Sequence, residues 1–312
     1  MNRKQRKSKQ RRKVRWGRVS LVFMALLIAG GGTWIYYIYH NLKNTVDQDV
    51  HESVASIDNE ITKGKVKDQE PLNILLLGVD ERANDRGRSD TMIVLTLDPN
   101  NERMQMVSIP RDTRTEIIGR GTTDKINHSY AFGGSDMAVN TVENFLDIEI
   151  DYFSTVNMEG LEQLVDSVDG VTVDNDLAFS NGRFDFPEGE LYLDGREALA
   201  YVRMRKDDPQ GDAGRNERQR QVIEGVLSKG ASFSSMNKFH DILDVLGDNV
   251  STNMDFSDMR TLATDYRGAR KTIDTYQVEG DGTYIGDVWY LLVPDGEVQK
   301  VHHMIKDYPD KL

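Results

Sequence analysis

The chain has 312 residues and no cysteine, which excludes disulfides, thiolate catalysis and cysteine-based zinc sites. Residues 1–18 carry ten Lys/Arg and no Asp/Glu, so the rest of the chain must carry −22 to give the whole-chain net charge of −12. Such an acidic body argues against nucleic-acid binding, because affinity for nucleic acids comes largely from the neutralisation of phosphates by Lys and Arg.

An uncharged, apolar segment follows the basic run. Residues 19–39 have about the length that crosses a hydrocarbon core of roughly 30 Å. Trp34 and three tyrosines gather at its end, as in an interfacial aromatic belt, and the basic residues 1–18 place their own flank in the cytoplasm. A cleaved signal peptide is the alternative, but its apolar run is usually shorter and a small-residue cleavage site follows it. We therefore expect an uncleaved transmembrane helix, a single-pass location in the cell membrane and an extracellular C-terminal body.

Residues 40–70 are polar, and we expect them to form an extracellular stalk. Apolar residues recur there every three or four positions: Leu42, Val46, Val50, Val54, Ile57 and Ile61. This spacing predicts a helical stripe, although a solvated linker with chance spacing is an alternative. Pro71 marks the expected beginning of the folded body, residues 71–312.

Beyond Pro71, short apolar runs alternate with helical patterns. The expected strands are Asn73–Gly78, Thr91–Leu97, Met104–Ile109, Tyr152–Met158, Gly170–Val173, Thr272–Val278 and Trp289–Val293. The expected helices are Ser135–Leu146, Glu159–Val168, Gly195–Tyr201, Arg215–Lys229, Met236–Leu246, Phe256–Tyr266 and Glu297–Lys306. This alternation predicts an α/β fold in which helices flank a mixed central β-sheet as an α/β/α sandwich.

The first candidate motif ends the first expected strand. Asp80 follows NILLLGV, and Asp90 comes ten residues later, next to the second strand, with Arg88 between them. Adjacent strand ends would bring the two carboxylates together at the edge where open α/β sheets bind ligands. Two carboxylates can hold Mg²⁺, which takes its other oxygen ligands from water and phosphates. Turn capping is the alternative for each aspartate alone.

Two further basic residues belong to short motifs. Arg111, in SIPRDT, ends the third expected strand and so reaches the same sheet edge. Lys125, in DKINHSY, follows a glycine-containing loop. Each residue alone would be an ordinary solvated charge, so both are candidates only in combination with the other motifs.

The most specific motif is YVRMRKDDPQGDAGRNERQRQ, Tyr201–Gln221. A change from helix to extended chain near its beginning would direct Arg203 and Arg205 to one face, because alternate residues of an extended segment point the same way. Asp212 is expected in the Gly/Asp/Pro loop that follows. The next helix then places three side chains on one face, beginning near the positive end of its dipole: Arg215, Arg218 and Gln219. Local salt bridges are the alternative, but the planar guanidinium fork suits phosphate.

These residues indicate phosphoryl transfer, in which positioning and cationic groups do most of the catalysis. The sequence has neither a P-loop motif nor a dinucleotide-binding glycine motif after a strand, so we expect no nucleotide substrate. It also has no HExxH or GxSxG motif, which argues against zinc hydrolysis and serine-esterase chemistry. An extracellular phosphoryl donor must bring its own activation, as a lipid-linked diphosphate does.

In this order, the motifs NILLLGVDER, RSDTMIV, SIPRDT, DKINHSY, GVTVDN and YVRMRKDDPQGDAGRNERQRQ resemble those of the LytR-CpsA-Psr family. The resemblance is strong from Asn73 to Lys229 and looser from there to Leu312. It implies a single-span protein of a Gram-positive envelope. The implied activity is a phosphotransferase, assisted by Mg²⁺ or by Mn²⁺ in its place, that attaches an anionic glycopolymer such as wall teichoic acid to peptidoglycan. The implied donor is the glycopolymer linked to polyprenyl diphosphate.

The resemblance also implies roles for individual residues. Asp80 and Asp90 match the carboxylates linked to Mg²⁺. The implied diphosphate contacts are Arg88, Arg111, Arg203, Arg205, Arg218 and Gln219. Lys125 and Asp212 match site residues whose role is less defined. The family's apolar channel for the polyprenyl tail would be lined by Ser135–Leu146 and Val222–Leu227, unless these faces simply pack in the core.

The mechanism that these roles suggest is attack of an acceptor hydroxyl on the sugar-proximal phosphorus, with polyprenyl monophosphate as the leaving group. Either Asp80 or Asp90 would take the hydroxyl proton. Three alternative functions remain. One is a non-catalytic envelope regulator of the transcriptional-attenuator type. The others are a polyprenyl diphosphate hydrolase that uses water as the acceptor, and a lipid-binding module with no turnover.

Overall fold

The computed structural model describes residues 50–81, 86–205, 208–230 and 249–310, together with His40, Lys43, Val46 and Gly247. The predicted membrane segment, residues 19–39, and the predicted helix Met236–Leu246 lie outside these described residues. Within the described part of the chain, no helix is both long enough and apolar enough to cross a membrane. From Leu42 to Leu312 the chain forms one structural unit, which contains all the predicted site residues.

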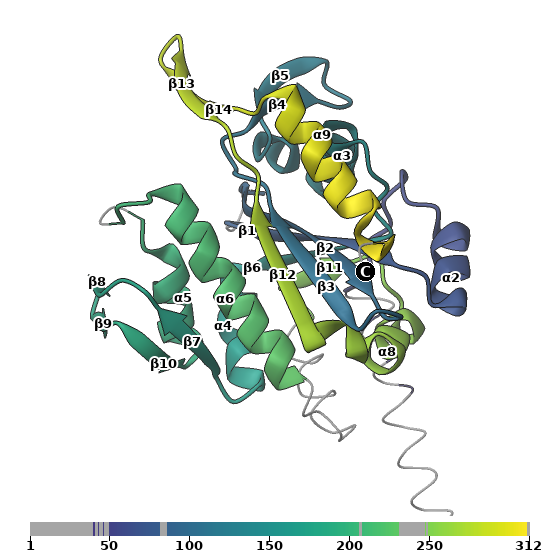
Figure 1. The fold of residues 1–312 in the computed structure, drawn as a ribbon, viewed down its shortest axis with the longest axis horizontal. Helices are drawn as coiled ribbons and strands as arrows, with labels where there is room; N and C mark the ends of the chain where they lie inside the picture. Colours follow the sequence, from purple (N-terminus) through teal and green to yellow (C-terminus); the bar gives the residue numbers. More distant parts are fainter. Residues whose placement is uncertain are drawn as a thin grey trace, which may run out of the picture. The chain divides into compact units, whose positions relative to one another are not determined.

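A six-stranded mixed sheet lies at the centre of this unit (Figure 1). In spatial order its strands are β11 (Val250–Thr252), β6 (Tyr152–Asn157), β1 (Leu72–Val79), β2 (Ser89–Asp98), β3 (Arg103–Ser108) and β12 (Thr272–Gln277). Strands β1, β2 and β3 form an antiparallel meander, while β6 runs parallel to β1 and β12 runs parallel to β3. The predicted mixed sheet is therefore confirmed; the short strand β11, antiparallel to β6, had no prediction.

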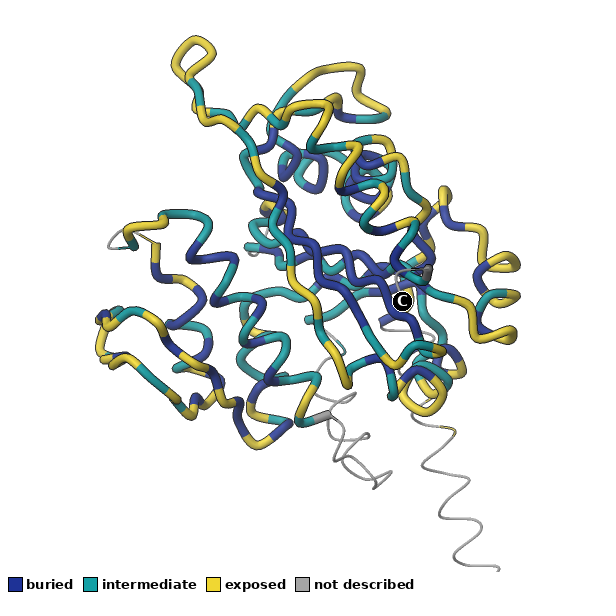
Figure 2. The backbone as a smooth tube through the Cα atoms, viewed as in Figure 1, coloured by how far each residue is buried: buried dark blue, intermediate teal, exposed yellow. Residues whose placement is uncertain are grey.

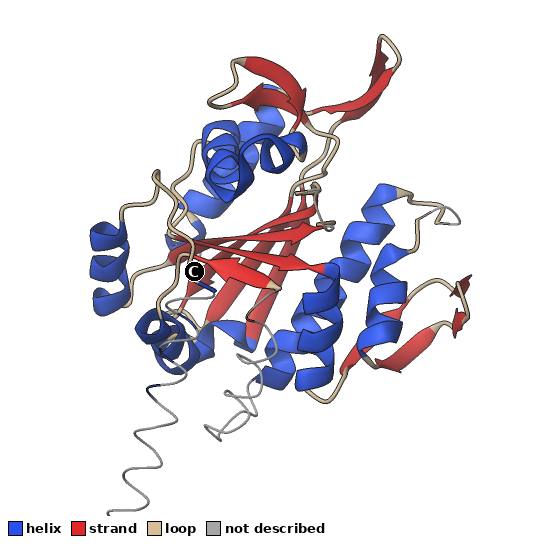
Figure 3. Cartoon of the chain, turned by 180° about the vertical axis from the view of Figure 1, so that it is seen from behind, coloured by secondary structure: helices blue, strands red, loops and turns tan. Residues whose placement is uncertain are grey.

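Helices cover both faces of the sheet (Figure 3). They are α2 (Asn59–Asp68), α3 (His128–Leu146), α8 (Phe256–Asp265) and α9 (Asp295–Lys306). Because successive strand residues point to opposite faces, Leu75 and Leu77 of β1 pack in a core with α3 and α9, while Leu72 and Ile74 pack in a core with α2 and α8. Figure 2 shows the sheet as largely buried between these helices. Two 3₁₀ helices, η2 (Arg267–Lys271) and η3 (Tyr308–Asp310), complete this part of the chain.

A third core lies in the segment between β6 and β11. Its elements are α4 (Met158–Ser167), β7 (Val171–Asn175), β8 (Phe179–Asn181), β9 (Phe184–Phe186), β10 (Gly189–Leu193), α5 (Gly195–Arg203) and α6 (Asp212–Gly230). Helix α6 joins this core to the sheet, because Val222 packs in the third core while Ile223 and Leu227 pack against the sheet core. The N-terminus of α6 is thereby held in a fixed position.

The apolar face of α3 packs in the core rather than along a channel. Ala138, Val139 and Val142 are fully buried against the sheet. Of the two faces considered for a polyprenyl channel, α3 is thus occupied by core packing, whereas Ile223 and Leu227 of α6 are only partly buried.

Residues assigned to the stalk belong to the folded body. Val54 and Ile57 pack in the same core as Leu75, and the backbone N–H of Ala55 donates to Asp136 Oδ1 at 2.9 Å. Ile61, the last residue of the predicted stripe, is 57% exposed. The folded body therefore begins before the predicted boundary at Pro71. The prediction was late because this segment is polar overall, and only a few of its side chains are apolar and buried.

Two β-hairpins lie beyond one end of the sheet (Figure 1). They are β4 (Arg114–Ile117) with β5 (Thr122–Lys125), and β13 (Asp281–Ile285) with β14 (Val288–Leu292). Only β14 coincides with a predicted strand, Trp289–Val293. The other three strands are short and mostly polar or exposed, so they lack the apolar alternation from which a strand is predicted.

Candidate functional site

Asp80 and Asp90 lie at adjacent strand ends, as the sequence predicts. Strand β1 ends beside the beginning of β2, and the N–H of Asp80 donates to the carbonyl of Arg88 at 3.0 Å. The pairing register shifts between Gly78 and Val79 and passes over Asp90, as in a β-bulge. Bulges redirect side chains near active sites, so this irregularity separates Asp90 from the regular alternation of β2.

Arg111 contacts the carboxylate of Asp90. Its Nη1 lies 2.9 Å from Asp90 Oδ2, and its Nε lies 3.7 Å from Asp112 Oδ2 and 3.8 Å from Asp212 Oδ1. Burial alone would lower the pKa of Arg111, but these carboxylates, Asp90 first, outweigh burial and raise that pKa above its ordinary value. Arg111 therefore joins the β2 strand end to the beginning of α6.

Arg215 adds a buried guanidinium to this group. Its Nη2 lies 2.9 Å from Asp212 Oδ1 and donates to the carbonyl of Asp90 at 3.4 Å. Burial lowers the pKa of Arg215; Asp212 opposes this effect and the nearby charge of Arg111 adds to it. The sequence predicts a helix that begins at Arg215, but α6 begins three residues earlier, at Asp212. Asp212 is therefore the first residue of the helix and not a loop residue. The site thus includes the positive end of a helix dipole.

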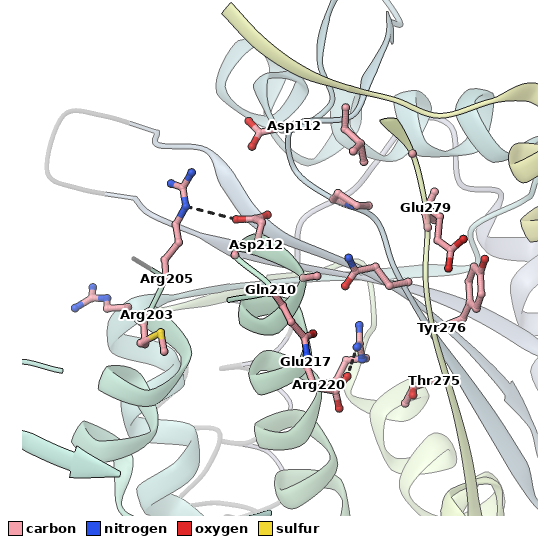
Figure 4. A pocket seen from close by; sticks show the side chains of 18 of the residues that line it. Asp112, Arg203, Arg205, Gln210, Asp212, Glu217, Arg220, Thr275, Tyr276 and Glu279 are labelled. Atoms are coloured by element: carbon pink, nitrogen blue, oxygen red, sulfur yellow. Dashed lines mark hydrogen bonds and ion pairs between the residues drawn. The ribbon is translucent and has the colours of Figure 1, made fainter. Parts of the chain in front are cut away.

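Arg203 and Arg205 follow a different local structure from the predicted one. Helix α5 continues to Arg203, and the extended backbone begins at Met204 (φ −62°, ψ 135°), three residues after Tyr201. Both arginines are exposed and line a cleft (Figure 4). Arg205 is directed toward Asp212, with its Nε 3.8 Å from Oδ1.

Arg218 lies outside the cleft lining and contacts the neighbouring loop. Its Nη1 pairs with Asp208 Oδ2 at 2.6 Å, its Nη2 donates to the carbonyl of Met204 at 2.8 Å, and its guanidinium lies 5.3 Å from the ring centre of Phe179. Arg218 therefore holds the segment that carries Arg203 and Arg205, and the diphosphate contact that the family resemblance implies for Arg218 stays a prediction. Gln219 is half-buried on the same helix, also outside the cleft lining.

Lys125 and Arg88 occupy the margins of the site. Lys125 Nζ pairs with Asp112 Oδ1 at 2.6 Å, so it neutralises a carboxylate that lines the cleft. Arg88 is exposed beside the end of β1.

The magnesium site that the sequence suggests at Asp80 and Asp90 stays a prediction. Asn127 Nδ2 lies 3.4 Å from Asp90 Oδ1, and the buried Oδ1 of Asn127 has no hydrogen-bond partner within the described part of the chain. The described residues contain no group of three or more acidic or histidine side chains that could enclose a metal by themselves. Mg²⁺ does not require a larger acidic group, because it commonly binds one or two carboxylates and completes its coordination shell with water and substrate phosphates.

The cleft has a volume of about 1570 Å³ and lies between the α5–α6 connection and the β12–β14 segment (Figure 4). Residues from both sides line it: Pro110, Asp112, Ser180, Asn181, Arg203, Met204, Arg205, Gln210, Gly211, Asp212, Ala213, Glu217, Arg220, Thr275, Tyr276, Gln277, Val278, Glu279, Gly280, Trp289 and Leu291. Arg220 is a lining residue that the sequence analysis did not select. It donates to Ser108 Oγ at 2.8 Å and pairs with Glu217. The only sequence feature that pointed to Arg220 was its position in the arginine-rich motif Tyr201–Gln221.

Several buried groups of the site lack a hydrogen-bond partner among the described residues. They include the Nε atoms of Arg111, Arg215 and Arg220. Unpaired buried donors are costly, and phosphate oxygens are strong acceptors for guanidinium groups. The arrangement can therefore bind a polyanion beside a carboxylate that is already held in place.

These features define a mixed α/β protein with a cleft at one end of its sheet, lined by both arginines and acidic residues. A model of the LytR_cpsA_psr family matches residues 36–307, so the chain belongs to that family. The resemblance noted in the sequence is thus confirmed.

Named relatives cover nearly the whole chain. The polyisoprenyl-teichoic acid–peptidoglycan teichoic acid transferase TagU of Bacillus subtilis (strain 168) is 46% identical over 291 residues, which cover 93% of this chain and 95% of TagU. The crystal structure of B. subtilis TagU matches with a TM-score of 0.64 at 45% identity, covering 78% of this chain and 98% of that one. A structure of TagT bound to LI-WTA matches with a TM-score of 0.70 at 30% identity, covering 82% and 98%.

Proposed function

We propose that this protein is a phosphotransferase that moves an anionic glycopolymer, of the wall teichoic acid kind, from a polyprenyl-diphosphate carrier to peptidoglycan. The names of its relatives support the reaction class. The observation that carries the proposal is the group of paired side chains formed by Asp90, Arg111, Asp212 and Arg215, because it holds two guanidinium groups in place beside the cleft in an otherwise acidic body.

In the proposed mechanism, the arginines hold the donor diphosphate. Arg203 and Arg205 line the cleft and are exposed, so they can contact the diphosphate oxygens, while Arg111 and Arg215 supply fixed positive charge near Asp90. A Mg²⁺ ion held by Asp80 and Asp90, with Asn127 as a further oxygen donor, would neutralise charge on the phosphates. Because the transition state spreads negative charge over phosphate oxygens, this pre-positioned charge lowers the barrier.

The acceptor hydroxyl then attacks the sugar-proximal phosphorus. A new phosphorus–oxygen bond forms to the acceptor, and the bond to the bridging oxygen breaks and releases polyprenyl monophosphate. The hydroxyl proton passes to a carboxylate, either Asp90 or Asp80. Arg111 holds Asp90 by one oxygen, Oδ2, and so fixes the orientation of its carboxyl group.

We further propose that residues 19–39 anchor the enzyme in the cell membrane, with residues 1–18 in the cytoplasm and the cleft outside. The absence of charge in the segment and the ten cations before it support this topology. A membrane anchor would keep the cleft near a carrier whose polyprenyl tail lies in the same bilayer.

The test is transfer of a labelled lipid-linked polymer to wall glycan by the full-length protein in detergent. We expect Asp90→Ala and Arg205→Ala to reduce kcat/KM by roughly 100-fold, the loss typical of a missing charged transition-state contact. Arg260→Ala, an exposed arginine of α8 outside the cleft lining, is the matched control and should transfer like the unmodified chain. Chelation by EDTA should stop transfer, and added Mg²⁺ should restore it.

Three results would contradict this proposal. Unimpaired transfer by Asp90→Ala and Arg205→Ala would remove the assigned site. Release of polyprenyl monophosphate at the same rate without any glycan acceptor would favour a hydrolase. Absence of turnover in the unmodified chain, with a cellular effect that depends on residues 2–16, would favour a regulator.

A further inference from the structure

The β13–β14 hairpin presents two aromatic side chains to solvent. Tyr284 is 68% exposed and Trp289 is 42% exposed, and their rings meet edge to face with centroids 5.1 Å apart. Ile285 and Val288, next to the turn, are exposed as well. Figure 2 shows the backbone at the tip of this hairpin in the colour of exposed residues. A contiguous exposed apolar patch of this kind marks a surface that binds something.

The ring of Trp289 lies over a glycine, Gly282. Tyr284 pairs with Trp289 across the hairpin, and Gly282 lies two residues before Tyr284 on the same strand. A Cβ atom at Gly282 would lie only 2.1 Å from Cζ2 of Trp289. The indole therefore rests over the backbone of Gly282, which only a residue without a side chain permits. We call Tyr284 and Trp289 the aromatic platform.

The base of the hairpin is fixed to the body. The N–H of Leu291 donates to the carbonyl of Asp112 at 2.9 Å, and the hydroxyl of Tyr290 donates to Asp124 Oδ1 at 3.3 Å. The guanidinium of Arg114 lies 5.8 Å from the ring centre of Tyr290. Because the base is anchored, the aromatic platform has a defined position before any ligand binds, which lowers the entropy cost of binding.

The aromatic platform adjoins the cleft. Trp289 and Leu291 line the same cavity as Arg203 and Arg205. Figure 4 shows Arg203 and Arg205 on the side of the cavity opposite Tyr276 and Glu279. A polymer bound along the hairpin would thus extend toward the proposed diphosphate position. The hairpin side offers aromatic surface, and the α5–α6 side offers positive charge.

Charge decides which ligand suits the hairpin. Residues 279–295 contain Glu279, Asp281, Asp287 and Asp295 and no Lys, Arg or His. Such a segment repels an anionic polymer and an anionic lipid surface. Uncharged hexosamine rings suit it better, because the C–H face of a pyranose is apolar and packs flat on an aromatic ring.

We propose that the aromatic platform binds the hexosamine rings of the acceptor glycan strand. This inference rests on the proposed function and deepens it, because it assigns the acceptor to the β13–β14 side of the cleft and leaves the donor to the arginine side. Tyr284 and Trp289 would orient the acceptor strand without touching the reacting phosphorus.

The first experiment uses chitohexaose, a neutral N-acetylhexosamine oligomer, and the full-length protein in detergent. We expect Trp289→Ala and Tyr284→Ala each to raise the Kd for chitohexaose about tenfold, as truncation of an aromatic anchor typically does. Gly282→Ala should weaken binding similarly, because its methyl group displaces the indole while Trp289 remains. Tyr192→Ala, an equally exposed tyrosine on β10, is the matched control and should bind like the unmodified chain. Unchanged Kd values in the first two variants would overturn the proposal.

A second measurement separates sugar from lipid. Trp16→Phe and Trp34→Phe together leave Trp289 as the only tryptophan. With this variant in nanodiscs, chitohexaose should change the fluorescence emission of Trp289. If brominated lipid quenched this fluorescence and the sugar had no effect on it, Trp289 would contact the membrane and the proposal would be overturned.

Transfer assays separate this inference from the proposed function. Trp289→Ala should raise KM for wall glycan about tenfold while KM for the lipid-linked donor stays unchanged. Transfer with an unchanged glycan KM would overturn the aromatic platform alone. Absence of transfer in the unmodified chain, with chitohexaose binding still dependent on Trp289, would overturn the proposed function and support the platform.

Discussion

The arginines around the cleft fall into an inner and an outer group. The inner group is buried or half-buried, and each member lies within 3 Å of a carboxylate oxygen: Arg111 with Asp90, Arg215 with Asp212, Arg218 with Asp208, and Arg220 with Glu217. The outer group, Arg203 and Arg205, is exposed, and the carboxylate contact of Arg205 is long, at 3.8 Å. The inner group is therefore positioned by the fold, whereas the outer group can be positioned by a ligand. Preformed charge favours catalysis, and mobile charge allows a bulky donor to enter.

The largest expected effect comes from breaking an inner pair. Arg218→Ala leaves Asp208 buried without its partner, so we expect a loss of about 3–5 kcal/mol in the free energy of unfolding, measured by urea denaturation. The double variant Arg218→Met/Asp208→Leu removes both charges and should recover most of that stability. If Arg218→Ala left the unfolding free energy unchanged, the distinction between the two groups would fail.

The outer group should show the opposite behaviour. Because Arg203 is exposed, Arg203→Ala should change the unfolding free energy by less than about 0.5 kcal/mol. It should raise KM for the lipid-linked donor several-fold, and this effect should shrink as salt screens the charge. Steady-state kinetics at two ionic strengths would measure it. A stability loss comparable to that of Arg218→Ala would contradict the assignment of Arg203 to the outer group.

The smallest expected effect concerns Asp124, which accepts the hydrogen bond from Tyr290 at the base of the hairpin. Burial would raise the pKa of Asp124, but hydrogen bonds from His128 and from the backbone of Lys125 outweigh burial and lower it. Because the folded pKa is lowered, the stabilisation is complete above the ordinary aspartate pKa of about 4 and is lost as pH falls through the folded value.

The corresponding variant is Asp124→Asn. It should lower Tm at pH 7, by an amount equivalent to less than about 1 kcal/mol, and should reduce the decline of Tm below about pH 4. Melting curves across this pH range would measure both effects. An unchanged acid limb would show that Asp124 does not contribute to it.

Sequence patterns predicted the central sheet because its strands are apolar runs buried on both faces, such as NILLLG in β1. They also predicted that Asp80 and Asp90 lie at one edge, since chain order alone brings the end of β1 to the beginning of β2. The extra residue at Asp90 was not predictable, because a bulge depends on the pairing partner and leaves no local pattern.

The role of Arg218 shows a different limit. Helical spacing correctly put Arg218 on α6 beside Arg215, and both side chains are buried. Its partners, Asp208 and the carbonyl of Met204, belong to the preceding loop, whose path a periodicity argument does not determine. Two arginines that are three positions apart on one helix can therefore contact different parts of the fold.

The order of elements along the chain also determines when the cleft can exist during synthesis. One wall ends at Arg220, whereas the other begins with β12, which pairs with β3 only after residues 272–277 have been made. A growing chain that stops before Leu291 thus contains every arginine of the site but no complete binding cavity. Formation of the complete cavity therefore depends on the C-terminal part of the chain, although every arginine of the site precedes it.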